Sequence, residues 1–140
     1  MNINKFNSEG YCDPTAFEAL CNVEKAEKAY CPLVYVCSPY AGNIAVNTEN
    51  ARRYSRFAVE QNCIPLTPHL LYPVILNENN PAERELGLFF GIVLLCKCSE
   101  IWVFGDNISS GMSAEIDKAK RKNIPVRYFN DACEEVKTNA

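Results

Sequence analysis

The chain has 140 residues and a formal net charge of −3, and 48% of its residues are hydrophobic while 22% are charged. This composition is typical of one globular domain and excludes a disordered or collagen-like chain. Because no basic stripe occurs, we expect no duplex nucleic acid as a partner, although a small anion could still bind at one arginine or at a helix N-terminus.

The first half of the chain predicts an arm, two helices and a strand. Residues 1–12 are expected to form a flexible arm, and Asp13 followed by Pro14 predicts the start of a helix over residues 14–30. Residues 33–37 are nearly all apolar, which indicates a strand buried on both faces. A loop at residues 38–42 then leads to a helix over residues 47–61.

The second half predicts three strands and two helices. Residues 63–67 favour an edge strand, because Pro65 has no N–H to donate to a neighbouring strand. After a loop or broken turn at residues 68–73, a helix is expected over residues 81–98, followed by a strand at 101–104. Ser109 or Ser110 caps a helix that ends near residue 123. The last strand spans residues 124–129, and a polar tail covers 131–140.

Strands that alternate with helices predict a parallel sheet with right-handed crossovers. We therefore expect an α/β fold, namely a small Rossmann- or flavodoxin-like three-layer sandwich with a mostly parallel sheet of four to five strands and an extra N-terminal helix. Residues 13–130 would form its single domain. Ligands of such sheets bind outside the carboxyl ends of the strands, and this rule selects the loops that follow them.

The helix over residues 81–98 is apolar almost all round, so more than one of its sides should be buried. We expect five of its residues to form the stripe that covers the sheet: Leu86, Phe89, Phe90, Val93 and Leu94. Leu88, Ile92 and Leu95 would then point elsewhere. Either the N-terminal helix or a second subunit could cover them, and the sequence favours a homodimer or higher homo-oligomer.

The compartment follows from the N-terminus and the cysteines. The first residues, MNINKFNSEG, lack the apolar core of a signal peptide, and the longest apolar run is too short to span a bilayer. We expect a cytoplasmic protein, in a bacterium or a phage-infected host, with no membrane partner. The eight cysteines would then be unpaired thiols.

Two carboxylates are candidates for catalysis. Asp106 follows a predicted strand and Glu115 lies in the next helix, so both could face one cleft and divide the work of nucleophile and proton donor. Spacing alone favours the simpler interpretation, in which Asp106 caps the helix and Glu115 interacts with its dipole. His69 is the only histidine and follows a strand, where a ligand contact and an ordinary loop residue are equally expected.

Several familiar sites are absent from the sequence. It contains no Gly-x-Ser-x-Gly turn, no Walker loop and no Gly-x-Gly-x-x-Gly segment, which argues against a serine hydrolase, an ordinary NTPase and a dinucleotide dehydrogenase. Arg52, Arg53 and Arg56 are more typical of a solvated helix face than of a phosphate clamp. No metal and no organic cofactor is expected.

Four segments carry a resemblance to known proteins. They are VYVCSPYAG at 34–42, IPLTPH at 64–69, WVFGD at 102–106 and GMSAEI at 111–116. The same segments occur in this order in a family of small bacterial and phage proteins without an assigned function. That family resembles the nucleoside 2-deoxyribosyltransferase superfamily, and the resemblance covers about residues 13–129.

The resemblance implies roles for particular residues. Glu115 would be the nucleophile that attacks the anomeric carbon, and Asp106 would assist the leaving base, with Glu85 or Glu83 as other candidates. The resemblance also implies ligand contacts at Ser38, Tyr40, His69, Ser109 and Ser110. Further candidate contacts lie at the strand ends and at the start of the last helix, namely Pro39, Gly42, Gly111 and Met112. The superfamily pattern Val-Gly-x-x-x-Glu-Leu-Gly reads Ser-Gly-Met-Ser-Ala-Glu-Ile-Asp here.

Three functions are therefore open. The first is an enzyme that cleaves or transfers the N-glycosidic bond of a nucleoside, deoxynucleotide or related nucleotide through a carboxylate nucleophile. The second is a nucleotide-binding protein without turnover, for example a sensor or a phage-encoded sponge for a signalling nucleotide. The third is an oligomeric structural module whose cleft has no activity.

Overall fold

A five-stranded sheet organises the part of the chain that the computed structural model describes, which is residues 30–137. Its strands are β1 (Leu33–Cys37), β2 (Ile64–Leu66), β3 (Glu100–Phe104), β4 (Val126–Phe129) and β5 (Glu135–Val136). They lie in the order β2-β1-β3-β4-β5. The first four in this order are parallel and β5 is antiparallel to β4, so the sheet is mostly parallel as predicted.

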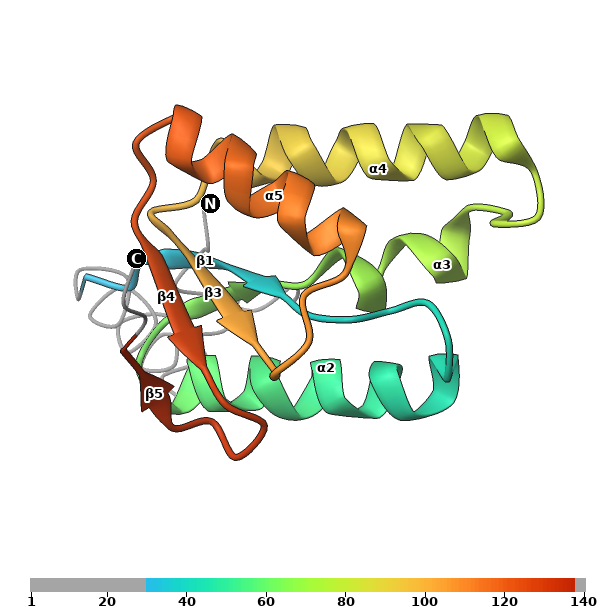
Figure 1. Cartoon of the computed structure of the whole chain (residues 1–140). Helices are drawn as coiled ribbons and strands as arrows, with labels where there is room; N and C mark the ends of the chain where they lie inside the picture. The colour runs from blue at the N-terminus through green and yellow to red at the C-terminus, as the bar shows by residue number, and fades with distance from the viewer. Residues whose placement is uncertain (1–29, 138–140) are drawn as a thin grey trace, which may run out of the picture. The chain divides into compact units, whose positions relative to one another are not determined.

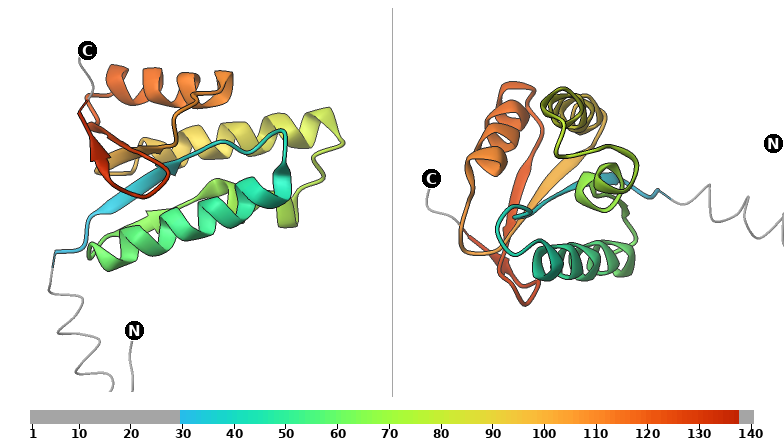
Figure 2. Two further views of the ribbon diagram at one scale, coloured as in Figure 1. Left: turned by 60° about the horizontal axis from the view of Figure 1, so that its bottom comes forward. Right: turned by 90° about the vertical axis from the view of Figure 1, so that its right-hand side faces the viewer.

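Three long helices cover the two faces of this sheet (Figure 1). They are α2 (Ile44–Glu60) on one face, and α4 (Pro81–Leu95) and α5 (Ser110–Arg121) on the other. Two short helices, η1 (Pro68–Leu70) and α3 (Tyr72–Ile75), connect β2 to α4. Figure 2 shows the layers end-on, with α3 in the gap between α4 and α2. The predicted three-layer sandwich is confirmed.

Alternation along the central strands divides the core between the two faces. Val34 and Val36 pack with Trp102, Phe104 and the α2 side chains, whereas Tyr35 and Cys37 point to the α4 and α5 side. Strands buried on both faces are expected to be almost continuously apolar, and β1 and β3 meet that expectation. The alternation also aims a tyrosine and a cysteine at the helix that carries Glu115.

Helix ends follow the capping residues. Asn43 caps α2 by accepting a hydrogen bond from Val46 N, which explains why the helix begins three residues before the predicted position 47. Ser109 caps α5 as predicted, through a bond from Met112 N. The segment predicted as a loop at 68–73 instead forms η1 and the start of α3, because Pro68 and Pro73 fit the first turns of helices.

Two further boundaries differ from the sequence predictions. α4 ends at Leu95 instead of residue 98, since Lys97 and Cys98 hydrogen-bond back in a tight turn before β3. The tail predicted to be only polar contains β5, whose Glu135 binds Arg127 of β4 through an ion pair. The predicted edge position of β2 is confirmed, and the predicted arm and N-terminal helix lie outside the described residues.

The predicted orientation of α4 is wrong. Its buried residues are Gly91 and Leu95, while three members of the predicted inward stripe are exposed: Leu86, Phe89 and Val93. The physical reason is a close approach, because a Cβ atom at Gly91 would lie 3.2 Å from the Tyr35 hydroxyl. The helix therefore turns its glycine side toward the sheet and its larger apolar side chains outward.

Thiols are found in several settings within residues 30–137. Cys37 and Cys98 are buried, Cys96 is exposed, and none of these three forms a disulfide. In the same part of the chain, no helix has both the length and the apolar character needed to cross a membrane.

The outward stripe of α4 generates a prediction about assembly. Phe89 is 61% exposed, and each large apolar side chain left in water forgoes roughly 1.5–3 kcal/mol of burial. We expect a second copy of the chain to cover Leu86, Phe89 and Val93. Light scattering at micromolar concentration should therefore give at least twice the chain mass of 15.7 kDa, and Phe89→Asp should reduce it to one chain.

Val46→Asp is the matched control, because Val46 is also exposed (52%) but lies on α2, on the other face of the sheet. That variant should keep the wild-type mass. A wild-type mass of one chain that persists on concentration would contradict the prediction.

Candidate functional site

A hollow of about 340 Å³ opens at the carboxyl edge of the parallel strands. Ser38, directly after β1, and Pro68, shortly after β2, line it together with the first turns of α5 and one side of α4. This is the edge at which open α/β sheets bind ligands. A cavity therefore lies where the sheet topology predicts a ligand site.

Glu115 is the central ionisable group of this hollow. It lies in the second turn of α5, and its carboxyl group faces Tyr35 and Cys37 of β1. Burial raises the pKa of Glu115 from 4.5 to about 7, while hydrogen bonding from Cys37 and Tyr35 opposes part of the rise. The burial of Tyr35 and Cys37, and then the charge of Glu115, raise the pKa values of both, so these two groups stay protonated as donors.

Two polar atoms in the hollow are buried without a hydrogen-bond partner among the described residues. They are Glu115 Oε2 and Ser38 Oγ. An unsatisfied buried polar atom costs stability and requires an explanation, such as a catalytic role or a missing ligand. Since both atoms line one cavity, a polar ligand that bonds to both would remove the cost.

A tyrosine–histidine pair forms the wall opposite α5. The rings of Tyr40 and His69 stack with centroids 4.9 Å apart. His69 Nε2 donates to the carbonyl oxygen of Ser38 at 3.1 Å, and burial lowers the pKa of His69, which favours the neutral ring. Burial and a 2.9 Å hydrogen bond to Glu78 Oε2 raise the pKa of Tyr40 to about 12. The pair is therefore uncharged, and Glu78 is held beside it.

α4 makes space for the ligand by omitting side chains. Gly87 and Gly91 line the hollow one turn apart, and a Cβ atom at Gly87 would lie 3.3 Å from Leu76 Cδ1. Alanine at either position would narrow the cavity or displace a neighbour. The two glycines thus leave a flat strip of helix backbone against which a planar group could lie.

The structure brings most of the predicted site residues together. The hollow is lined by eight of them: Ser38, Tyr40, His69, Ser109, Ser110, Gly111, Met112 and Glu115. Asp106 is exposed and does not line it, and neither do Glu85, Pro39 and Gly42. Besides Glu115, two carboxylates line the hollow: Glu83, which the sequence offered as an alternative acid, and Glu78.

Sequence reasoning missed five residues that line the hollow, for identifiable reasons. Tyr35 was counted as core, although strand alternation places it on the same face as Cys37, beside α5. Glu78 lies in an irregular segment whose path cannot be read from periodicity. Arg84, Gly87 and Gly91 lie along one side of α4, and only the reversed orientation of that helix turns this side into the cavity.

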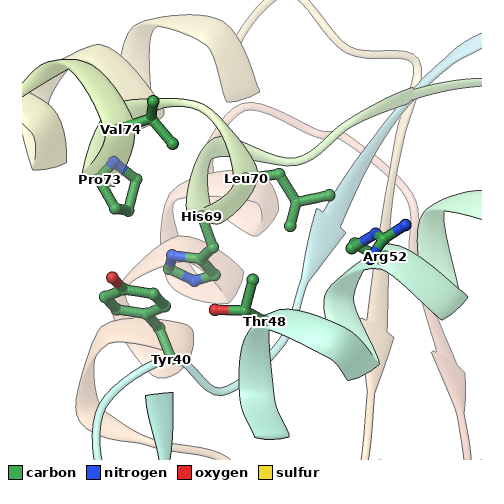
Figure 3. A pocket seen from close by; sticks show the side chains of 7 residues that line it. All are labelled: Tyr40, Thr48, Arg52, His69, Leu70, Pro73 and Val74. Carbon is green, nitrogen blue, oxygen red and sulfur yellow. The ribbon is translucent and has the colours of Figure 1, made fainter. Parts of the chain in front are cut away.

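A second hollow, of about 450 Å³, lies on the α2 side of the same wall (Figure 3). Thr48 and Arg52 project toward it from α2, and Leu70, Pro73 and Val74 complete its apolar lining. Tyr40 and His69 therefore border both hollows. We assign the site to the first one, because Glu115 and the two unpartnered buried atoms lie there.

The other charged candidates are engaged elsewhere. Arg52, Arg53 and Arg56 form ion pairs with Glu49, Asp131 and Glu60, mostly on exposed surface, which supports the interpretation of a solvated helix face. Within residues 30–137, no cluster of three or more His, Cys, Asp or Glu side chains has an arrangement suited to a metal ion.

The raised pKa of Glu115 predicts a pH-dependent stability. Between pH 4.5 and 7 the unfolded chain loses this proton while the folded chain keeps it, so Glu115 destabilises the fold increasingly as pH rises. Glu115→Gln removes this effect. Urea unfolding should show the variant gaining stability over wild type across this window, by up to about 3 kcal/mol at 1.4 kcal/mol per pKa unit.

Asp117→Asn provides the comparison, because Asp117 is exposed on the same helix and outside the hollow. It should follow the wild-type pH profile. A constant difference between Glu115→Gln and wild type from pH 4 to 8 would contradict a carboxyl group with a raised pKa.

Comparisons with known proteins agree with this architecture. The structure is similar to that of a 2-deoxyribosyltransferase from the psychrotolerant bacterium Bacillus psychrosaccharolyticus, with a TM-score of 0.61 and 13% sequence identity, over 75% of this chain and 77% of that one. At this identity the likeness shows the fold. A comparison with curated protein sequences gave no match.

The family model described as "Domain of unknown function (DUF7768)" matches residues 32–129. This range contains the sheet from β1 to β4, all the described helices and every residue that lines the hollow. The chain therefore belongs to the DUF7768 family, which has the 2-deoxyribosyltransferase-like α/β fold.

Proposed function

We propose that the protein cleaves or transfers the N-glycosidic bond of a nucleoside or nucleotide, with Glu115 as the nucleophile. A carboxylate oxygen of Glu115 would attack the anomeric carbon, and the carbon–nitrogen bond would break with its electron pair passing to the base. The base would take a proton from an acid in the site. Water or a second base would then attack the same carbon and release Glu115.

The observation that carries this proposal is the state of the Glu115 carboxyl group. Its Oε2 atom is buried and has no partner among the described residues, and it borders a cavity of suitable size for a small ligand. A largely buried carboxyl group with a pKa of about 7 is ionised often enough to attack and is a strong nucleophile when it is ionised.

Neighbouring groups suit the orientation of such a nucleophile. Tyr35 and Cys37 of β1 face the Glu115 carboxyl group as protonated donors, and its buried Oε2 atom has no partner among the described residues. The Ser38 hydroxyl is free among the described residues to bind a sugar hydroxyl. The likeness in fold to a 2-deoxyribosyltransferase supports this class of reaction, and it does not identify a substrate.

Glu78 is the best-placed acid for the leaving base. It lines the hollow and accepts a hydrogen bond from Tyr40, whereas Asp106 does not line the hollow. Glu83 also lines the hollow, but its Oε1 atom accepts a 3.5 Å bond from Asn77 N at the loop before α4. We therefore assign proton donation to Glu78 in the proposed mechanism.

Release of free base is the first test of this function. The purified protein is incubated with common nucleosides and deoxynucleosides, and with their 5′-phosphates, and the free base is measured by chromatography. We expect release from at least one of them, and loss of that release of 10³-fold or more in Glu115→Gln, because an amide is a poor nucleophile.

Asp117→Asn should retain wild-type turnover, and circular dichroism should show both variants folded. Tight ligand binding without base release would favour the alternative function of a nucleotide-binding protein. Near-normal release by Glu115→Gln would remove Glu115 from the mechanism.

The choice of acid is tested by comparing Glu78→Gln with Asp106→Asn. Removal of a general acid typically costs 10²–10⁴-fold in rate. We expect a loss in this range for Glu78→Gln, and a much smaller loss with a 7-methylguanine nucleoside, whose cationic base leaves without protonation. If Asp106→Asn shows this pattern instead, the proton donor is Asp106.

A further inference from the structure

Arg84 is a cation at the site that the proposed reaction does not use. It lies in the first turn of α4 and lines the hollow that contains Glu115. It forms no ion pair within the described part of the chain, although Glu78 and Glu83 line the same hollow. Four other arginines each have a carboxylate partner, namely Arg52, Arg53, Arg56 and Arg127. Arg121 also forms no ion pair within the described residues, but it does not line the hollow.

Local structure does not account for this arginine. The N-terminal turn of a helix carries partial positive charge, so a cation is disfavoured there and an acid is preferred. Glu83 occupies the same turn and meets that preference. Arg84 is exposed, lines the hollow and has no counter-ion, so it is available to an anion that arrives with the ligand.

The spacing of residues along α4 indicates how far that anion would lie from Glu115. Arg84 and Gly91 are seven residues apart and line the same hollow, and the backbone at Gly91 lies against the Tyr35 hydroxyl that bonds to Glu115. Seven residues of α-helix correspond to about 10 Å. The Cα–Cβ bonds of a helix tilt toward its N-terminus, which directs the Arg84 side chain away from Gly91.

This distance selects among nucleotides. In a nucleoside 5′-monophosphate the phosphorus lies closer to the anomeric carbon than one such helix length, so its phosphate would end short of Arg84. A second or third phosphate extends the anion by the missing distance. Arg84 would hold it through the paired N–H groups that guanidinium offers to phosphate oxygens.

We propose that the site takes a nucleoside 5′-diphosphate or triphosphate and that Arg84 binds its distal phosphate group. This inference rests on the proposed function for the position of the sugar, and it adds the class of substrate.

Glu78 and Glu83 do not oppose this binding strongly. Each already accepts a hydrogen bond, from Tyr40 OH and from Asn77 N respectively. Glu78 is exposed and Glu83 is half-buried, so the high dielectric constant of the nearby water weakens their repulsion of the phosphate. The direct contact between phosphate and guanidinium is screened much less.

The test measures affinity along a phosphate series, independent of turnover. Titration calorimetry is carried out on the full chain with adenosine, guanosine, cytidine, uridine and thymidine and with their 5′-mono-, di- and triphosphates. For the preferred base we expect the diphosphate or triphosphate to bind at least tenfold more tightly than the monophosphate. Arg84→Gln should remove this gain and leave the affinity for the nucleoside and the monophosphate within twofold.

Arg56→Gln is the matched control, because Arg56 is exposed on α2 and lines neither hollow. It should keep the full gain, and Arg84→Lys should keep part of it. The proposal is overturned if wild type gains nothing from the second phosphate, or if Arg84→Gln weakens the nucleoside as much as the triphosphate. If the protein released base from unphosphorylated nucleosides only, the proposed function would stand, and the proposal that Arg84 binds a distal phosphate would be rejected.

Discussion

The burial of one carboxyl group, that of Glu115, is the constraint on which the rest of the site depends. Its cost appears as a pKa raised to about 7, and only part of that cost is offset by Tyr35 and Cys37. β1 is an interior strand and is otherwise apolar, yet two of its five residues are hydrogen-bond donors beside Glu115. Such an arrangement stabilises the fold less than a leucine would, and it makes sense where the carboxylate performs chemistry.

The need for room around this carboxyl group then determines how α4 packs. Because Gly91 must pass close to the Tyr35 hydroxyl, the glycine side of the helix faces the sheet. The large apolar side chains of α4, among them Phe89, are left on the outside. One close contact thereby links three properties of the molecule: an open cavity, the place of Arg84 in its lining, and an exposed apolar stripe on α4.

Most of the fold was predictable because it depends on local and periodic signals. The nearly continuous apolar segments at β1 and β3 indicate buried parallel strands, and Pro65 identifies the edge strand. The rule that ligands bind at the carboxyl edge then selects Ser38, His69 and the start of α5, and the structure gathers all of these in one hollow. The short helices at Pro68 and Tyr72 were missed, since proline there reads equally well as a turn.

The layers of this protein and the edge of the sheet at which its site lies were predictable from the sequence, because both follow from periodicity within single strands and helices. Glu115 was selected as a nucleophile by the resemblance of four segments to a known family, since spacing alone favoured an interaction with the helix dipole. Only the tertiary structure decided which side of α4 faces inward, since an apolar helix with two glycines has no single hydrophobic face. The same holds for the second carboxylate. Asp106 was expected from the sequence, with Glu85 or Glu83 as alternatives, but the path of an irregular loop brings Glu78 to the cavity and leaves Asp106 outside it.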